Sequence, residues 1–265
     1  MPIIDFHTHI FPDALAPRAM KALLAGCDGR YQPVTDLTEK GLLARMDEWK
    51  IDKSVVQPVV TKPSQVNAIN DWAAEISSDR ILSFGGIFPS SPDVYADVDG
   101  VVSRGLRGIK LHPEYQGFDI DSPEMLRLYD YILSKGLILL FHTGFDPAFP
   151  PPFHSDPRRV AKVADEMKGG KIVAAHLGSM KMWDEVEKEL AGHDLYLDTS
   201  MGFGYYSRET FLGIAEKHPT SKILFATDSP WSNAHDELTA LFSLPLPREE
   251  IEAIAGGNAE KLLGL

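Results

Sequence analysis

The histidines of this sequence are concentrated where short apolar runs end. His7 and His9 follow the run Ile3–Phe6, at the two-residue spacing that places both side chains on one side of a β-strand. Later apolar runs are followed by His112, His142, His176 and Asp228. Imidazole nitrogens and carboxylate oxygens are ligands that Zn²⁺ and other divalent first-row ions prefer. If the apolar runs are strands of one sheet, these residues predict a metal site.

Each of these residues has a simpler explanation when it is taken alone. A single histidine at a strand end is commonly a hydrogen-bonded structural residue, and one His-x-His pair is a weak signal. The combination is more informative, because five of the nine histidines lie at such ends and an aspartate joins them. His193 and His218 fall outside the pattern, and we interpret both as structural, His218 as a cation suited to the C-terminal end of a helix.

Eight apolar runs of strand length alternate with amphipathic helical patterns along the chain. The runs are Ile3–Phe6, Ser54–Val60, Ile81–Ile87, Gly108–Leu111, Leu137–Phe141, Ile172–Ala175, Leu195–Leu197 and Ile223–Ala226. The expected helices are Leu37–Trp49, Val66–Ile76, Asp93–Val102, Pro123–Leu133, Pro157–Met167, Lys181–Leu190, Arg208–Lys217 and Arg248–Ala255. Pro123 and Pro157 are typical first-turn prolines behind the capping residues Ser122 and Asp156.

Eight strand–helix units in 265 residues predict an α/β fold of the (β/α)8, or TIM-barrel, type. We expect residues 1–265 to form a single domain. The alternative is an open doubly wound sheet, but no Gly-x-Gly-x-x-Gly follows an early strand. The nearly continuous apolar runs also suit strands that are covered on both faces.

The C-terminal ends of the strands meet at one face of such a barrel, where barrel enzymes have their active sites. The predicted metal site therefore lies at that face. Two long connections, Ile10–Asp36 and Gly144–Asp156, leave the same ends. The second is rich in Phe and Pro, and we interpret it as a loop that covers the substrate.

Composition limits the classes of partner. The net charge of −12 makes the chain a poor binder of phosphate backbones, and 44% hydrophobic residues allow a sizeable core. Cys27 is the one cysteine, which fits a reducing compartment. The sequence has no signal-peptide pattern and no apolar run of the roughly 20 residues that span a bilayer. We expect a cytoplasmic enzyme for a small molecule, without nucleic-acid or membrane partners, and a homodimer is compatible with the sequence.

The strand-end motifs, taken together, resemble a known family. They are Asp5-Phe6-His7-Thr8-His9, Lys110-Leu111-His112-Pro113, His142-Thr143-Gly144, Ala175-His176-Leu177-Gly178, Thr227-Asp228-Ser229-Pro230-Trp231 and Gly257-Asn258-Ala259. This set resembles the amidohydrolase superfamily over nearly the whole chain. It is most similar to the amidohydrolase-2 branch, which includes aminocarboxymuconate-semialdehyde-type decarboxylases and many hydrolases.

The resemblance implies metal ligands and catalytic residues. His7, His9, His142 and Asp228 correspond to the ligands, and Asp228 also to a proton acceptor. His176 corresponds to a catalytic residue beside a single ion, or to a ligand of a second ion. In two-metal members a carboxylated lysine or a glutamate bridges the ions, and Lys110 stands at that position. We favour one ion, most simply Zn²⁺, with Lys110 unmodified and facing the substrate; two ions are the alternative.

The expected activity is hydrolysis of an amide, lactone or ester bond of a small molecule by a metal-activated water. Nonoxidative decarboxylation of a small aromatic or unsaturated carboxylic acid is the alternative on the same scaffold. A non-catalytic metal-binding barrel and a TatD-like nuclease are more remote. The residues expected to contact the substrate are Lys110, His112, Tyr115, His154 and Trp231.

Overall fold

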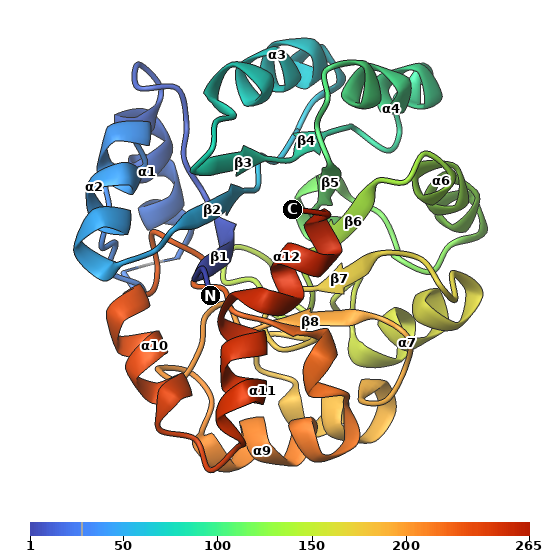
Figure 1. Ribbon diagram of the computed structural model, residues 1–265. Helices are drawn as coiled ribbons and strands as arrows, with labels where there is room; N and C mark the ends of the chain where they lie inside the picture. The colour runs from blue at the N-terminus through green and yellow to red at the C-terminus, as the bar shows by residue number, and fades with distance from the viewer. Residues whose placement is uncertain (28) are drawn as a thin grey trace.

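A ring of parallel strands surrounded by helices forms the molecule (Figure 1), as a computed structural model describes it for residues 1–27 and 29–265. The strands are β1 (Ile4–Thr8), β2 (Lys53–Val56), β3 (Ile81–Ser83), β4 (Gly85–Gly86), β5 (Gly108–Leu111), β6 (Ile138–Phe141), β7 (Ile172–Ala174), β8 (Tyr196–Asp198) and β9 (Ile223–Leu224). They pair in the orders β1-β2-β3 and β4 to β9, always parallel.

The two sheets close into one barrel. β3 and β4 both belong to the predicted run Ile81–Ile87, and Phe84 between them still donates its backbone N–H to Val56 O at 2.9 Å. At the other junction of the two sheets, β1 lies beside the segment that follows β9. There the Phe6 amide donates to Phe225 O at 2.9 Å, and Thr8 forms a β-bridge with Ser229. The predicted (β/α)8 barrel is therefore confirmed, with each predicted run supplying one barrel strand.

Helices cover the outside of the barrel at the predicted places. They are α2 (Glu39–Trp49), α3 (Val66–Ile76), α4 (Val94–Ser103), α6 (Pro123–Ser134), α7 (Pro157–Glu166), α8 (Trp183–Glu185) with the π-helix η2 (Val186–Leu190), α9 (Arg208–Lys217), and α11 (Arg248–Glu252) with the π-helix η4 (Ala253–Gly257). The Asp156 carboxylate accepts from the backbone of Arg158 and Arg159, as its capping role predicts. Ser122 occupies the N-cap position of α6 as predicted, although its side chain accepts no capping hydrogen bond.

Some segments are helical where no helix was predicted. They are α1 (Ala16–Gly26), α5 (Pro113–Gln116), α10 (Ala234–Phe242), α12 (Asn258–Leu263) and the 3₁₀ turns η1 (Pro63–Gln65) and η3 (Thr220–Lys222). The connection Ile10–Asp36 is thus not a plain loop, because α1 occupies its middle. No helix within the described residues is long and apolar enough to cross a membrane.

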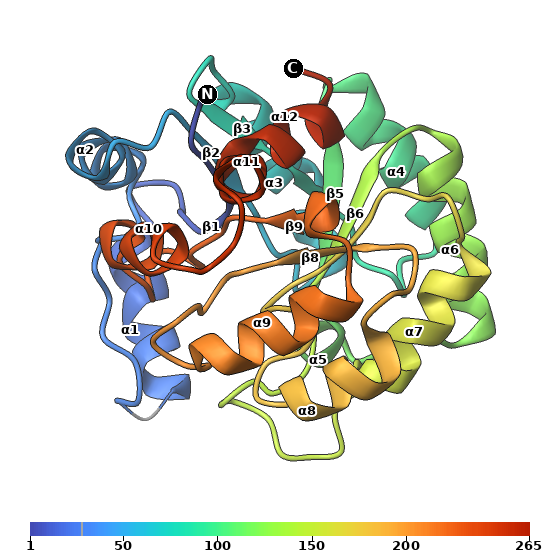
Figure 2. The same cartoon turned by 60° about the horizontal axis from the view of Figure 1, so that its bottom comes forward.

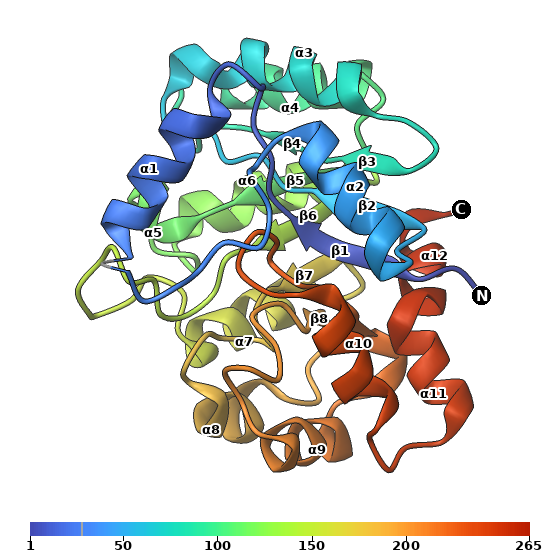
Figure 3. The same cartoon turned by 90° about the vertical axis from the view of Figure 1, so that its left-hand side faces the viewer.

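Side-chain alternation along the strands separates two layers of core. Ile138 and Leu140 of β6 point into the barrel, whereas Leu139 and Phe141 pack outward against the helices. Ala259, Leu262 and Leu263 of α12 join the inner cluster and close the barrel at the end where both termini lie. Figures 2 and 3 show α5 and α8 at the opposite end, where the strands finish.

Two residues outside that face have structural contacts. Asn258, in the predicted Gly257-Asn258-Ala259 motif, donates to Thr220 O and Ile223 O, both at 2.8 Å, and so ties α12 to the start of β9. His218 follows α9 and is buried. Burial and, to a smaller extent, the nearby charge of Lys222 lower its pKa to about 4. His218 is therefore neutral at pH 7, and its predicted role as a cation at the helix end was wrong.

Candidate metal centre

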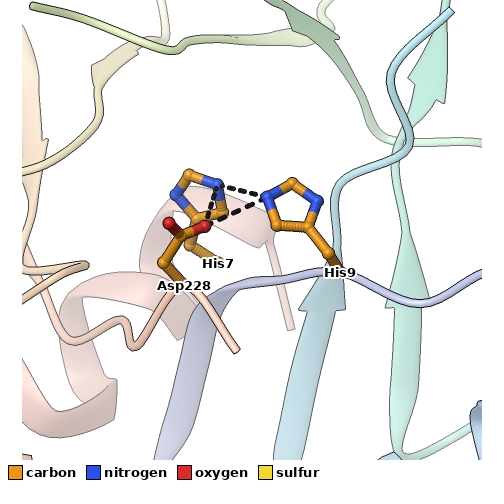
Figure 4. A group of neighbouring side chains, drawn as sticks. All are labelled: His7, His9 and Asp228. Atoms are coloured by element: carbon orange, nitrogen blue, oxygen red, sulfur yellow. Dashed lines mark hydrogen bonds and ion pairs between the residues drawn. The ribbon is translucent and has the colours of Figure 1, made fainter. Parts of the chain in front are cut away.

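His7, His9 and Asp228 meet where the first and last strands adjoin (Figure 4). His7 Nε2 lies 3.2 Å from His9 Nε2 and 3.4 Å from Asp228 Oδ1, and His9 Nε2 lies 3.1 Å from the same oxygen. Asp228 reaches this position from a left-handed backbone conformation, φ +60°, which aspartate adopts more readily than most residues.

A register shift in β1 helps to aim His7. Asp5 pairs with Ser54 but Thr8 pairs with Val56, so β1 has one extra residue between these points. Such a bulge changes the direction of side chains near a site. Phe6 can therefore pack inside the barrel while the following His7 also reaches the barrel interior, where it contacts Lys110.

The Nδ1 atoms of His7 and His9, which face away from the group, have fixed hydrogen-bond partners. His7 Nδ1 lies 2.9 Å from Asp198 Oδ2, and His9 Nδ1 lies 2.8 Å from the carbonyl oxygen of Gln57. Because these oxygens accept hydrogen bonds, the Nδ1 atoms carry the protons. In neutral rings the Nε2 atoms then present lone pairs to each other and to the Asp228 carboxylate.

Three acceptor atoms that converge without a proton between them form a site for a cation. Bonds of 2.0–2.1 Å in a tetrahedral zinc shell separate neighbouring ligands by about 3.3 Å. The separations of 3.1–3.4 Å among His7, His9 and Asp228 match this value. The residues present therefore fit a divalent ion.

The charge states of the group favour the same ion. Burial lowers the pKa of His7 well below its usual value, and Lys110 lowers it further, so the ring is neutral. Burial raises the pKa of Asp228, but the imidazoles of His7, His9 and His176 outweigh it and bring that pKa to about 2. An ionised carboxylate beside the neutral His7 imidazole is a form that binds metal.

Lys110 lies directly beside this group. It belongs to β5, whose Ile109 and Leu111 pack outward, so the Lys110 side chain points into the barrel. Its Nζ lies 3.1 Å from His7 Nε2, and the side chain is 1% exposed. Burial lowers the pKa of Lys110 to about 8, although Asp228 and Asp198 raise it. The amine is thus mostly protonated at pH 7, with about a tenth of it uncharged.

His142 and His176 form a separate pair. His142 Nδ1 lies 3.0 Å from His176 Nε2, and the His176 ring stacks on His7 with centroids 5.5 Å apart. Burial lowers the pKa of both residues. Of the five predicted ligands, three form a close group, whereas His142 and His176 face each other next to it. His142 Nε2 is buried and has no hydrogen-bond partner.

Asp198 connects both sets, although it was not among the predicted site residues. One of its oxygens accepts from His7, and the other accepts from the His176 amide at 3.0 Å, the Ser200 amide at 3.0 Å and the Ser200 hydroxyl. Ser200 Oγ lies 2.9 Å from His176 Nδ1. The position of Asp198 at the end of β8 was the available signal. Nothing in the sequence distinguishes Asp198 from an ordinary strand-end aspartate.

The predicted substrate residues are arranged around the centre at different depths. His112 is buried and stacks on His142, with centroids 4.0 Å apart and planes 7° apart. Tyr115 is 39% exposed and contacts His112 edge to face. The ring and backbone nitrogens of His154 both bind the carboxylate of Glu114, each at 2.7 Å. The Trp231 ring lies 6.0 Å from that of Tyr31.

Asp146 is a second carboxylate that sequence reasoning missed. It lies in the predicted covering loop, is 7% exposed, and places Oδ2 at 3.4 Å from His112 Nε2. His112, His142 and Asp146 each present an atom within 4.8 Å of the other two. Asp146 follows no strand directly, so the strand-end pattern could not identify it.

A small apolar cluster lies apart from the main core and is contributed by the connections that follow β1, β6, β7, β8 and β9. It contains Cys27, Tyr31, Met180 and Met201, with Leu24, Phe145, Trp183, Tyr205 and Trp231 packed against them. Burial, then Tyr205 and the carboxylates of Asp146 and Asp228, together raise the pKa of Tyr31 to about 12. This cluster therefore forms an aromatic and methionine-rich wall beside the polar centre.

A family model described as Amidohydrolase (Amidohydro_2) matches residues 4–265. The chain belongs to this family. The predicted resemblance to the amidohydrolase-2 branch is confirmed, and with it the assignment of the chain as an enzyme. Amidohydrolases of this family are metal-dependent, which supports the coarser part of the cofactor prediction. No curated protein matches the sequence.

Solved structures share the fold of this amidohydrolase at low sequence identity. An uncharacterised TIM-barrel protein from Bordetella bronchiseptica is 20% identical, with 100% of this chain and 99% of that chain covered and a TM-score of 0.79. A dihydroxybenzoic acid decarboxylase from Polaromonas with bound manganese and the inhibitor 2-nitroresorcinol is 16% identical, covering 100% and 97%, with a TM-score of 0.73. A probable 2-pyrone-4,6-dicarboxylic acid hydrolase from Acinetobacter baumannii with citric acid bound is 15% identical, covering 100% of both chains, with a TM-score of 0.67.

Proposed function

We propose that this amidohydrolase is a metal-dependent hydrolase that cleaves an amide, lactone or ester bond of a small molecule. The supporting observation is the convergence of three proton-free acceptors, His7 Nε2, His9 Nε2 and Asp228 Oδ1, at 3.1–3.4 Å from one another. A divalent ion there, which we propose to be Zn²⁺, supplies Lewis acidity and a strong nucleophile from water near neutral pH. We also propose that residues 1–265 act as one domain.

Asp228 is the proposed base. Its low pKa keeps the carboxylate ionised, and Oδ1 faces the two histidines that hold the ion. In this position it accepts a proton from the attacking water and returns it to the leaving group. The leaving amine or alcohol is thereby released as a neutral molecule.

His176 is proposed to serve as an acid/base for the substrate, because its Nδ1 proton is held by Ser200 and its Nε2 lone pair can take up a proton. The Ser200 hydroxyl donates to Asp198 and accepts from His176 Nδ1, which fixes the ring with respect to the His7 ring on which it stacks. His142, whose Nδ1 lies 3.0 Å from His176 Nε2, remains the proposed fourth ligand of the ion.

Lys110 determines how many ions the site holds. As an amine it occupies the space beside His7 and serves as the cation for a substrate carboxylate, which is the one-ion form that we favour. As a carbamate, formed from the uncharged amine and CO₂ with loss of a proton, it would supply carboxylate oxygens as ligands for a second ion. Native mass spectrometry of the intact protein distinguishes these forms by the added CO₂.

Decarboxylation of a small aromatic acid is the second candidate. It is favoured by the burial of an amine beside the triad, where Lys110 would bind the carboxylate that is lost. Assays of 2,6-dihydroxybenzoate for CO₂ release and of aryl esters, lactones and N-acyl compounds for hydrolysis separate the two activities.

Metal analysis is the test of the centre. Protein purified without added metal and then loaded with Zn²⁺ should retain at least one ion per chain after dialysis, and Asp228→Asn and His9→Ala should retain less and lose activity. Asp194→Asn, which removes an acid remote from the triad, is the matched control. Full retention of metal and activity by both site variants, with the fold intact by circular dichroism, would show the assignment to be wrong.

A further inference from the structure

Glu237 is a buried carboxylate that the proposed hydrolytic step does not use. It lies on α10, which covers the outside of the barrel, and the residue is 7% exposed. Burial raises the pKa of Glu237 to about 7, against the lowering effect of the hydrogen bonds that it accepts. A carboxylate removed from water in this way needs a set of donors to compensate for its lost hydration.

Two loops at the C-terminal ends of the strands supply those donors. The Phe203 amide, in the loop after β8, donates to Glu237 Oε2 at 2.8 Å. The Gly204 amide in the same loop and the Ser232 hydroxyl in the segment after β9 also hydrogen-bond the carboxylate and lower its pKa. Glu237 therefore ties α10 to both loops at once.

Gly202 shows how closely the loop after β8 packs against this carboxylate. A Cβ on Gly202 would overlap Glu237 Oε2, so glycine is the residue that lets the backbone lie against the acid. The Gly202 carbonyl oxygen accepts from the Tyr205 amide at 2.8 Å and from the Tyr206 amide at 3.3 Å, which closes the loop into a turn. The place of Tyr205 is thereby fixed relative to Glu237.

The same two loops carry part of the aromatic and methionine-rich wall beside the polar centre. Met201 and Tyr205 come from the loop after β8, and Trp231 comes from the segment after β9. The Tyr205 ring meets the Tyr31 ring edge to face, with centroids 5.6 Å apart. Burial raises the pKa of Tyr205, and Asp228 raises it further, so Tyr205 lies near the proposed base.

We propose that Glu237 is a positioning residue for the substrate, whose carboxylate binds the loops after β8 and β9 together and so holds Tyr205 and Trp231 against the part of the substrate that lies beside the metal. This inference rests on the proposed function and adds to it a determinant of substrate affinity outside the metal centre. Loss of the carboxylate should weaken the binding of groups that reach the wall and leave binding at the metal unchanged.

Two hydroxamates separate these effects in the zinc-loaded full-length protein. Acetohydroxamate and benzohydroxamate bind zinc through the same pair of oxygens, but only benzohydroxamate has a ring that can reach the wall. Isothermal titration calorimetry gives both dissociation constants, and their ratio measures the contact of the ring with the wall.

Glu237→Gln keeps the shape of the side chain but replaces one acceptor oxygen by a donor, which cannot bond the amides of Phe203 and Gly204. We expect this variant to bind benzohydroxamate about two- to tenfold more weakly than the wild type, which is the effect of losing one aromatic contact. Its affinity for acetohydroxamate should be unchanged. Glu249→Gln, which changes an exposed glutamate of α11, is the matched control and should behave as the wild type.

The pH dependence of the ratio provides a readout that needs no variant. Above pH 7 Glu237 is ionised and accepts from both loops, whereas below pH 7 it carries a proton and one oxygen accepts less well. Asp236 on α10 also acts on Glu237, and the loop tyrosines Tyr205 and Tyr206 stay neutral because burial raises the pKa of both. The wild type should therefore favour benzohydroxamate more at pH 8 than at pH 6, and Glu237→Gln should show the weaker preference at both.

Gly202→Ala is an independent variant, because its methyl group would displace the carboxylate from the turn and should reproduce the loss of preference. An unchanged ratio in Glu237→Gln, an equal loss of affinity for both hydroxamates, or a wild-type ratio that does not change between pH 6 and pH 8 would overturn the proposal. So would a wild type that binds benzohydroxamate no more tightly than acetohydroxamate.

The positioning role and the proposed function fail in different ways. If acetohydroxamate binds the zinc-loaded wild type while Glu237→Gln leaves the ratio of the two dissociation constants unchanged, only the positioning role is wrong. If the wild type holds no zinc and binds neither hydroxamate, both are wrong.

Discussion

Replacement of Asp198 by asparagine tests how the metal site is built, because the change is nearly isosteric and removes no proposed ligand. Oδ1 of Asp198 accepts from the His176 amide, the Ser200 amide and the Ser200 hydroxyl, whereas Oδ2 accepts from His7 Nδ1 alone. Asparagine has one acceptor oxygen, and three donors should retain it. The amide NH₂ then faces His7 Nδ1.

That reversal changes the tautomer of His7. Nδ1 must accept instead of donate, so the ring proton moves to Nε2 and blocks the lone pair that faces His9 and Asp228. Mutation of a residue that hydrogen-bonds a metal-binding histidine typically lowers metal affinity by about 10- to 100-fold. This is equivalent to about 1.4–2.7 kcal/mol. We therefore expect Asp198→Asn to bind Zn²⁺ about 10- to 100-fold more weakly than the wild type.

Competition with a fluorescent zinc chelator measures the affinity, and ¹⁵N spectra of the histidine rings report the tautomer directly. Asp194→Asn is the control, since that carboxylate pairs with Lys222 away from the site. An unchanged zinc affinity in Asp198→Asn, or a His7 ring that keeps its proton on Nδ1, would refute the reasoning.

Three further outcomes follow from the structure. Gly144 has φ +82° and a Cβ there would lie 2.4 Å from Ser179 Oγ, so Gly144→Ala should lower the free energy of unfolding by more than Gly169→Ala, which shares the positive φ but has open space around it. The pKa of His218 falls from 6.5 to about 4 on folding, so the stability that its neutral form contributes is complete above pH 6.5 and is lost as the pH falls toward 4. Urea unfolding at pH 7 and pH 5 should show a loss of stability that is about 2 kcal/mol smaller in His218→Gln than in the wild type, because the other buried histidines contribute equally to both. Glu114→Gln should raise hydrogen exchange in residues 144–156, while Glu124→Gln should leave it unchanged.

The sequence was sufficient for the barrel and for the types of residue at its centre. Strands covered on both faces are continuously apolar, so runs such as Leu137–Phe141 and Ile172–Ala175 stand out, and polar residues at their ends stand out equally. Helix α1 was missed although its sequence carries the signal, since Ala16, Ala19, Met20, Leu23 and Leu24 repeat at helical spacing. The segment was interpreted as part of a long connection, and Ala16 is its one fully buried residue.

The contacts that set the chemistry depend on residues far apart in the sequence. Asp198 lies 191 positions from the His7 ring that it orients, and periodicity carries no information on such a pair. The division of the histidines into a triad and a pair likewise depends on ring orientation, which a strand-end pattern does not determine. Asp146 owes its place to a loop held by Ser155 and Glu114, which only the folded chain brings together.

The seam between β1 and the segment after β9 has a consequence for how the chain folds. An ion held by His7, His9 and Asp228 links residues that lie 221 positions apart, so it closes a loop of nearly the whole polypeptide. The entropy cost of bringing such distant residues together is large, and contacts of high sequence separation form late in folding. Bound metal should therefore stabilise the barrel after it has closed, by slowing the separation of β1 from the segment after β9. In the metal-free protein the first and last strands should unfold before the middle of the barrel.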